Sequence, residues 1–205
     1  HIARRLLTVA RGGAPVKKIS SLKEIVAESA EFALDGTHND LALDMPDTLR
    51  TVNADAGQVG QVINNLVLNA SQAMDHAGVL QVSGENVALT EANKAGLRPG
   101  VYVCICVRDT GCGISPEDMK RIFDPFYTTK RKGSGLGLST AYSIAKAHDG
   151  GLVADSTPGR GSCFRVYFPA CSAPVREPQP ESPSARPTRN ARVLVRAHGE
   201  PPETY

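Results

Sequence analysis

The sequence of 205 residues has no tryptophan, few aromatic residues and no long hydrophobic run. No apolar stretch approaches the roughly 18 residues that a membrane-spanning helix needs, and no signal-peptide pattern is present. We therefore expect a cytoplasmic segment without direct membrane contact. A membrane anchor elsewhere in a parent protein is left open.

Neither sign of charge dominates. Lys and Arg number 23 against 21 Asp and Glu, which gives a formal net charge of +2. This near-balance argues against a strongly basic nucleic-acid-binding protein and against a charged disordered chain. The hydrophobic share of 41% is enough for a core, so we expect one domain with room for a tail and no nucleic-acid partner.

The five cysteines lack the spacing of a zinc site, since there is no CxxC pair and no suitably placed histidine. Cys104 and Cys106 alternate on one face of a predicted strand. The other three are scattered, at Cys112, Cys163 and Cys171. We expect reduced, structural cysteines in a cytosolic protein.

Glycine and proline, in contrast, are frequent, at 19 and 14 residues. Glycines concentrate between Gly111 and Gly161, and prolines between Pro174 and Pro202. The Pro/Ser/Arg-rich composition after about residue 171 predicts a linker. Residues 1–11 have the pattern of the end of a helix, so we expect a piece of a longer protein.

Hydrophobic periodicity predicts helices and strands in an irregular order. Expected helices cover 21–34, 56–74 and 138–148, with a short one from Ser115, and expected strands cover 41–45, 79–88, 101–108, 151–156 and 162–168. The segment 56–74 has an apolar stripe of period 3.6 and no charged residue, which predicts burial on nearly every side. Because strands and helices do not alternate regularly, we predict an α+β sandwich, a mixed sheet with helices on one face.

Two amides lie on one face of the predicted helix 56–74. Asn65 and Asn69 are four residues apart, so their side chains point the same way. Burying both without partners is costly, and Mg²⁺ with attached phosphates would supply partners, since the Asn carbonyl oxygen suits this ion. The alternative is that such amides are helix caps or exposed side chains.

A run of Asp-Thr-Gly-Cys-Gly-Ile, residues 109–114, follows the predicted strand 101–108. The carboxylate of Asp109 at a strand end can accept a hydrogen bond from an exocyclic amine. Gly111 and Gly113 would let a flat base approach the backbone. The alternative is a tight turn with an Asp cap.

Three glycines in six residues, at Gly133, Gly135 and Gly137, open the predicted helix 138–148. Consecutive backbone N–H groups at a helix N-terminus form an anion cradle. The pattern is not a Walker motif, because no Gly-Lys-Ser/Thr follows, and it does not follow a strand as a Rossmann motif would.

Three of the ten aromatic residues cluster just before this loop, at Phe123, Phe126 and Tyr127. The segment 122–130 is interpreted as a lid that closes over a nucleotide, with a packed loop as the alternative. Lys130 and its two basic neighbours would meet phosphate charge, unless they form a solvated loop.

In their order, these motifs resemble those of the ATP-binding catalytic domain of sensor histidine kinases, in the Bergerat-fold ATPase superfamily. The resemblance covers about residues 15–170 and implies a Bergerat-type α/β sandwich that binds ATP and Mg²⁺. Residues 1–14 would then be the end of a dimerisation and phosphoacceptor helix. Residues 171–205 would be a linker with a vestigial receiver-like start at 192–195.

The resemblance also implies roles for individual residues. Asn69 would coordinate Mg²⁺ with Asn65 beside the triphosphate, and Asp109 would hold the adenine amine near Ser162. Thr128-Thr129-Lys130 resembles a sub-group of the family often fused to receiver domains, which would place Lys130 near the γ-phosphate. The remaining expected nucleotide contacts are Gly111, Gly113 and Ile114 at adenine, Phe123 and Phe126 in the lid, and Thr129, Gly133, Ser134, Gly135, Leu136, Gly137 and Leu138 around the phosphates.

Asn65 stands where the gyrase, MutL and Hsp90 relatives carry a general-base Glu. An amide cannot take the proton, so we expect slow hydrolysis and transfer of the γ-phosphoryl group to a protein acceptor, with Asn65 and Lys130 as the catalytic residues. No His in the chain matches the family's acceptor. Expected partners are therefore a separate histidine-bearing dimerisation hairpin and a downstream response regulator. The alternatives are a nucleotide-sensing module without transfer and a gyrase-like ATPase.

Overall fold

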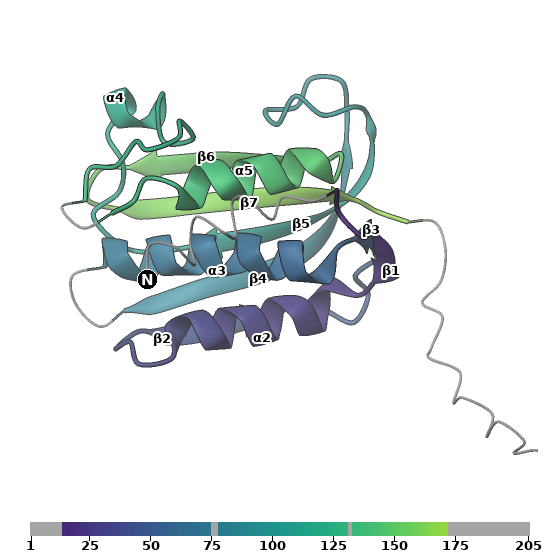
Figure 1. Ribbon diagram of the computed structural model, residues 1–205, viewed down its shortest axis with the longest axis horizontal. Coiled ribbons are helices and arrows are strands. Elements are labelled where there is room, and N and C mark those ends of the chain that lie inside the picture. Colours follow the sequence, from purple (N-terminus) through teal and green to yellow (C-terminus); the bar gives the residue numbers. More distant parts are fainter. Residues whose placement is uncertain (1–13, 75–77, 131–132, 172–205) are drawn as a thin grey trace, which may run out of the picture. The chain divides into compact units, whose positions relative to one another are not determined.

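Helices cover one face of a five-stranded mixed sheet (Figure 1). The computed structural model describes residues 14–74, 78–130 and 133–171, which all belong to one compact unit. The predictions for residues 1–13 and 172–205, including the linker and the receiver-like strand, lie outside the described residues.

The large sheet has the strand order β2-β4-β5-β7-β6. Its strands are β2 Asp40–Asp44, β4 Val79–Leu89, β5 Gly100–Arg108, β6 Gly151–Thr157 and β7 Gly161–Pro169. The pair β2–β4 is parallel and the other pairs are antiparallel, so the expectation of a mixed sheet is confirmed.

Three long helices pack on this sheet, and α3 contacts both of the others. They are α2 Leu22–Leu34, α3 Ala56–Ala73 and α5 Gly137–Ala147, and the short α4 covers Pro116–Met119. Ser21 caps α2 by accepting a hydrogen bond from the Lys23 N–H, and Asp55 caps α3 in the same way through Gln58. None of the helices among the described residues combines the length and the apolar character needed to cross a bilayer.

The sequence missed two short strands, β1 Lys18–Ser20 and β3 Val52–Ala54, which pair with each other. Three residues are too few to show an alternating pattern. Both strands owe their structure to a partner more than thirty residues away along the chain.

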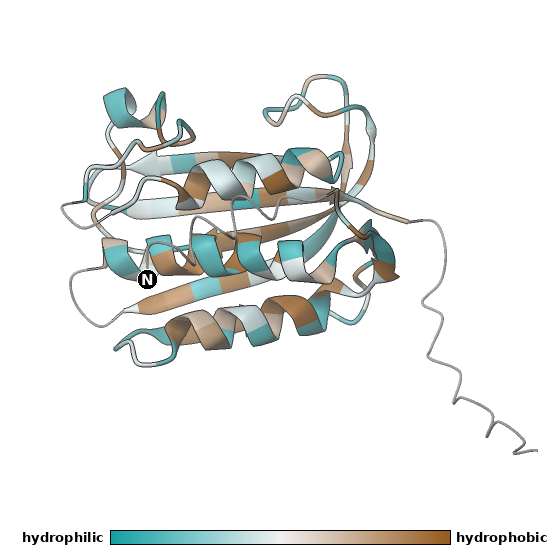
Figure 2. Cartoon of the chain, in the orientation of Figure 1, coloured by the Kyte–Doolittle hydropathy of each residue, from teal (hydrophilic) through white to brown (hydrophobic). Residues whose placement is uncertain are grey.

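The prediction that α3 is buried on nearly every side is wrong. Its apolar stripe is fully buried, and hydrophobic and hydrophilic residues alternate along the helix (Figure 2). Asn64, Asn65, Leu68 and Asn69 on the other side are half-buried and line a cavity. The helix α3 therefore has one face in the core and a second face along the cavity, and neither carries a charged residue.

Candidate functional site

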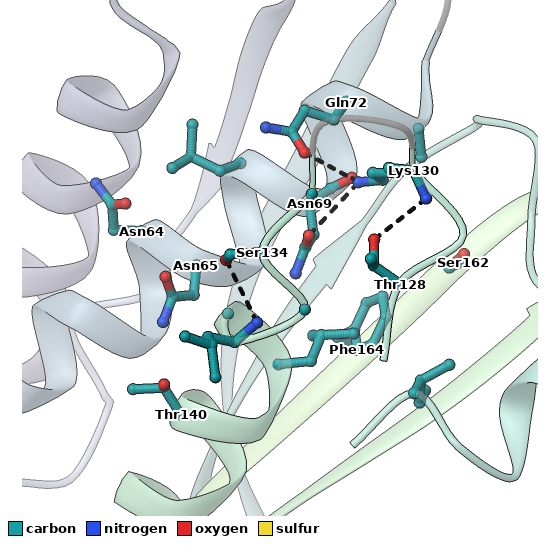
Figure 3. Close-up of a pocket in the computed structure, with 18 of the residues that line it drawn as sticks. Asn64, Asn65, Asn69, Gln72, Thr128, Lys130, Ser134, Thr140, Ser162 and Phe164 are labelled. Carbon is teal, nitrogen blue, oxygen red and sulfur yellow. Dashed lines mark hydrogen bonds between the residues drawn. The ribbon is translucent and has the colours of Figure 1, made fainter. Parts of the chain in front are cut away.

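A large open cavity of about 1510 Å³ lies between α3, the start of α5 and the segments 109–130 and 133–135 (Figure 3). The structure brings all but two of the predicted site residues to its walls. Those that line it are Asn65, Asn69, Asp109, Gly113, Ile114, Phe126, Thr129, Lys130, Gly133, Ser134, Gly135, Leu136, Gly137, Leu138 and Ser162. The two that do not are Gly111 and Phe123.

Asp109 forms one end of the cavity, directly after β5. The residue is 3% exposed, and its Oδ1 accepts hydrogen bonds from the N–H groups of Gly111 (2.9 Å) and Ser162 (3.2 Å). Its other oxygen, Oδ2, accepts no hydrogen bond from the described residues. Burial raises the pKa of this carboxyl, although both backbone hydrogen bonds act in the opposite direction. A ligand that donates a hydrogen bond to Oδ2 would complete the coordination of this buried group.

Backbone packing requires glycine at both positions after Asp109. A Cβ on Gly111 would lie 2.3 Å from the carbonyl oxygen of Ala73, at the end of α3. A Cβ on Gly113 would lie 2.2 Å from the carbonyl oxygen of Thr157, at the end of β6. Both positions exclude a side chain because two backbone segments meet there, whatever approaches from the cavity.

Phe123 is not part of a free lid. Its ring lies 5.2 Å from that of Tyr142 on α5, and it packs against the hydrophobic core. Phe126, in contrast, is 73% exposed and lines the cavity. The sequence pattern could not separate the two because both are aromatic residues in the same irregular segment.

The opposite end of the cavity combines the start of α5 with the two amides of α3. Leu136 precedes α5 without a side-chain cap, so in the described part of the chain the first N–H groups of this helix stay open. A Cβ on Gly137 would lie 3.6 Å from Asn69 Nδ2 and 3.8 Å from Asn65 Oδ1, so the start of α5 faces both amides. An open helix N-terminus that faces two amides suits phosphate oxygens.

The ammonium group of Lys130 contacts Asn69, the residue predicted to bind the metal. Lys130 Nζ donates to the side-chain oxygen of Asn69 at 3.5 Å, to its backbone oxygen at 3.3 Å, and to Gln72 Oε1 at 3.1 Å (Figure 3). Burial lowers the pKa of Lys130, while the neighbouring Cys112 and Asp109 raise it. These oxygens are hard donors, so the group fits Mg²⁺ as well as an ammonium.

The sequence missed the part of the cavity that reaches α2. Glu28, Ser29 and Phe32 line it there, together with Gly57, Gly60 and Gln61 at the start of α3. Spacings of three and four residues place them on one helical face each. Because they form no recognisable chemical motif, this spacing was the one available signal.

Gly135 packs against the backbone of Phe126 in the cavity wall, and Gly135→Ala is expected to weaken nucleotide binding about tenfold. Its φ is +66°, and a Cβ would lie 2.3 Å from the backbone of Phe126, whose N–H donates to the Gly135 carbonyl oxygen. The loop must therefore move. Titration of a fluorescent ATP analogue measures the loss.

Gly96→Ala is the matched control, because Gly96 has a similar φ of +61° and nothing within 4 Å of the new Cβ. It carries the backbone strain without the clash. Equal affinity losses in the two variants would contradict the specific role of the Gly135 contact.

Three helices cover a mixed sheet, and one cavity contains both an acceptor carboxylate and an open helix N-terminus. This combination defines an ATP-binding domain of the Bergerat type. Residues 54–172 match the family described as histidine kinase-, DNA gyrase B-, and HSP90-like ATPase. The chain belongs to this family, and it is the ATP-binding catalytic domain found in sensor histidine kinases.

Relatives of known name agree with this assignment. Sensor kinase CckA of Brucella abortus is 35% identical over 175 residues, which cover 82% of this chain and 18% of that protein. Sporulation kinase C of Bacillus subtilis is 38% identical over 118 residues, 58% of this chain and 25% of that protein. The chain thus spans about a fifth to a quarter of the length of these relatives.

Solved structures show the same fold. The catalytic domain of histidine kinase ThkA superposes with a TM-score of 0.62 at 26% identity, covering 75% of this chain and 95% of that one. Full-length ShkA in complex with AMPPNP gives a TM-score of 0.66 at 25% identity, covering 85% of this chain and 37% of that one.

Proposed function

We propose that this domain binds ATP with Mg²⁺ and transfers the γ-phosphoryl group to a histidine on a separate helical hairpin. One observation carries the proposal: a single cavity contains both the Asp109 carboxylate, whose Oδ2 accepts no hydrogen bond from the described residues, and the open start of α5 opposite Asn65 and Asn69. The adenine amine can donate a hydrogen bond to Asp109, and the triphosphate is an anion that suits the open N–H groups at the start of α5. The AMPPNP bound by the related ShkA supports the same ligand class.

In this proposal the adenine amine donates to Asp109 Oδ2. Ser162 supports that carboxylate through its N–H, and its own hydroxyl lies 3.0 Å from Ser156 Oγ. Ile114 and Gly113 line the cavity beside it. This carboxylate accepts hydrogen bonds and donates none, so it selects a nucleobase that presents a donor, as adenine does.

At the other end, the N–H groups of α5 and the loop 133–137 bind the phosphates, while Asn65 and Asn69 present amide oxygens and nitrogens to them. Bound Mg²⁺ would neutralise phosphate charge, with Asn69 as its ligand from the chain. Lys130 donates to that Asn69 oxygen in the structure. With Asn69 as a metal ligand, the Lys130 ammonium would be available to the γ-phosphate.

Transfer to a protein is favoured over hydrolysis by the composition of α3. This helix contains no Asp or Glu, so the face toward Gly137 has no base to activate water. Phosphoryl transfer needs positioning and charge neutralisation more than a protein base, and the site supplies both. The proposed partners are the acceptor hairpin and a downstream response regulator, and the proposed location is cytoplasmic.

The test mixes the purified chain with a separately produced phosphoacceptor hairpin of its parent protein and ATP labelled at the γ-phosphate. We expect acid-labile label on the hairpin, and none when its acceptor histidine is replaced by glutamine. An unlabelled hairpin despite measured ATP binding would contradict transfer. Rapid release of labelled phosphate without the hairpin would instead favour a gyrase-like ATPase.

A further inference from the structure

Two cysteines that are far apart in the sequence meet on the sheet face opposite the helices. Side chains alternate along a strand, and Val103, Ile105 and Val107 of β5 belong to the core under the helices. Cys104 and Cys106 therefore point to the other face. Cys163 of β7 does the same, because its neighbour Phe164 is in the core.

The register of β5 and β7 makes Cys106 and Cys163 diagonal neighbours. Cys106 pairs with Arg165, and Cys163 pairs with Arg108. The two sulfur atoms lie 2.7 Å apart, and both cysteines are free thiols. A disulfide bond is about 2.05 Å long, so the sulfurs need to approach by well under 1 Å to form one.

The surroundings favour a thiolate at one member of the pair. The hydrogen bond from Cys106, with help from the Arg165 and Arg108 guanidinium groups, lowers the pKa of the Cys163 thiol to about 6. Cys104 lies on the same strand and the same face, but burial raises the pKa of its thiol to about 12. Cys163 is itself buried, but its neighbour Cys106 is only half-buried, so a small oxidant can reach the pair past Cys106.

We propose that Cys106 and Cys163 are a reversible modification site that a two-electron oxidant such as hydrogen peroxide converts into a cross-strand disulfide. The Cys163 sulfur bonds to one peroxide oxygen as the O–O bond breaks, which gives a sulfenic acid and hydroxide. The Cys106 sulfur then displaces that oxygen: the S–O bond breaks, the S–S bond forms, and water leaves with the Cys106 proton. Two thiols lose two electrons in all, and the peroxide is reduced to water and hydroxide.

The bond would join the two strand ends that hold the adenine end of the cavity. Asp109 follows Arg108 at the end of β5, and Ser162 precedes Cys163 in β7. The backbone N–H of Asp109 donates to the Ser162 carbonyl oxygen at 3.0 Å. The modification therefore lies on the strands behind Asp109, outside the cavity, and its chemistry does not depend on the proposed kinase activity.

The test treats the reduced, purified chain with a small excess of hydrogen peroxide and counts thiols under denaturing conditions. We expect the count to fall from five to three and to return to five with dithiothreitol. Trypsin, followed by mass spectrometry without reduction, should link residues 95–108 to residues 161–165. These two peptides contain neither Cys112 nor Cys171.

Three single variants assign the link. Cys106→Ser and Cys163→Ser should each abolish it. Cys163→Ser should also slow thiol loss about tenfold or more, because it removes the thiolate that reacts first. Cys104→Ser is the matched control, because it removes a thiol from the same peptide and the same strand face, and the link should form as in the unaltered chain. A link through Cys104, Cys112 or Cys171, a link between two chains, or an unchanged thiol count would overturn the proposal.

Discussion

Replacing Asp109 with asparagine is expected to lower ATP affinity by about a hundredfold while the domain stays folded. Asparagine keeps an oxygen that accepts from the N–H groups of Gly111 and Ser162. It also places an NH₂ group where Oδ2 lies, so that two donors face each other when adenine enters. One unpaired buried donor and the loss of a charged acceptor cost about 3 kcal/mol together, which corresponds to roughly two decades of affinity. Calorimetric titration with ATP measures this loss.

The melting temperature of Asp109→Asn distinguishes a loss of ATP binding from a loss of folding. Burial raises the pKa of Asp109, so its contribution to stability is present below the ordinary pKa of 3.8 and is lost as the pH rises through the raised value. At neutral pH the chain bears the cost of the buried charge, and Asp109→Asn is expected to melt at the same or a higher temperature. A variant that melts lower at neutral pH would contradict this assignment.

The same shift predicts how nucleotide binding depends on pH. An adenine amine needs the charged acceptor, so ATP affinity should rise with pH through the raised pKa of Asp109 and then level off. The Asp109→Asn variant should lack this rise.

Asp118→Asn is the control for Asp109→Asn. Asp118 also lines the cavity but accepts a hydrogen bond from Tyr127, so this variant should bind ATP as the unaltered chain does. A loss of affinity as large as that of Asp109→Asn would contradict the specific role of Asp109.

Replacing Asn69 with leucine is expected to abolish the effect of Mg²⁺ on nucleotide affinity. Leucine has a similar volume but no oxygen for a hard cation, and it also removes a partner of Lys130. In the unaltered chain, Mg²⁺ should strengthen binding of ATP by about tenfold or more, since the ion offsets phosphate charge. In the variant, affinities measured with Mg²⁺ and with a chelator should coincide.

Asn64→Leu provides the comparison for this prediction. Asn64 lies on the same helix and lines the same cavity, yet Figure 3 shows it on the side toward α2, away from Lys130. Its replacement should leave the Mg²⁺ dependence intact. An equal loss in both variants would show that added apolar surface, rather than the Asn69 oxygen, causes the effect.

Much of the architecture followed from local pattern. The stripe on α3, the Ser21 cap of α2 and the alternating residues of β5 each reflect a single element, so their periodicity was sufficient to place them. The order of the glycine and asparagine motifs likewise placed most of the cavity wall, because each motif forms a compact piece of it.

The remaining features were decided by contacts between distant segments. Gly111 packs on Ala73 and Gly113 on Thr157, and nothing within the motif 109–114 indicates those partners. Phe123 docks on Tyr142, while Phe126, three residues later, faces the cavity.

The helices, the main strands and most of the motifs that line the cavity could be predicted from the sequence, because hydrophobic periodicity and motif chemistry are local properties. The tertiary structure alone decided the pairing of β1 with β3, the second face of α3 along the cavity and the contact of Cys106 with Cys163. The reason is physical: a strand register or a contact between sulfurs 57 positions apart depends on how separate elements pack, and no single segment encodes it.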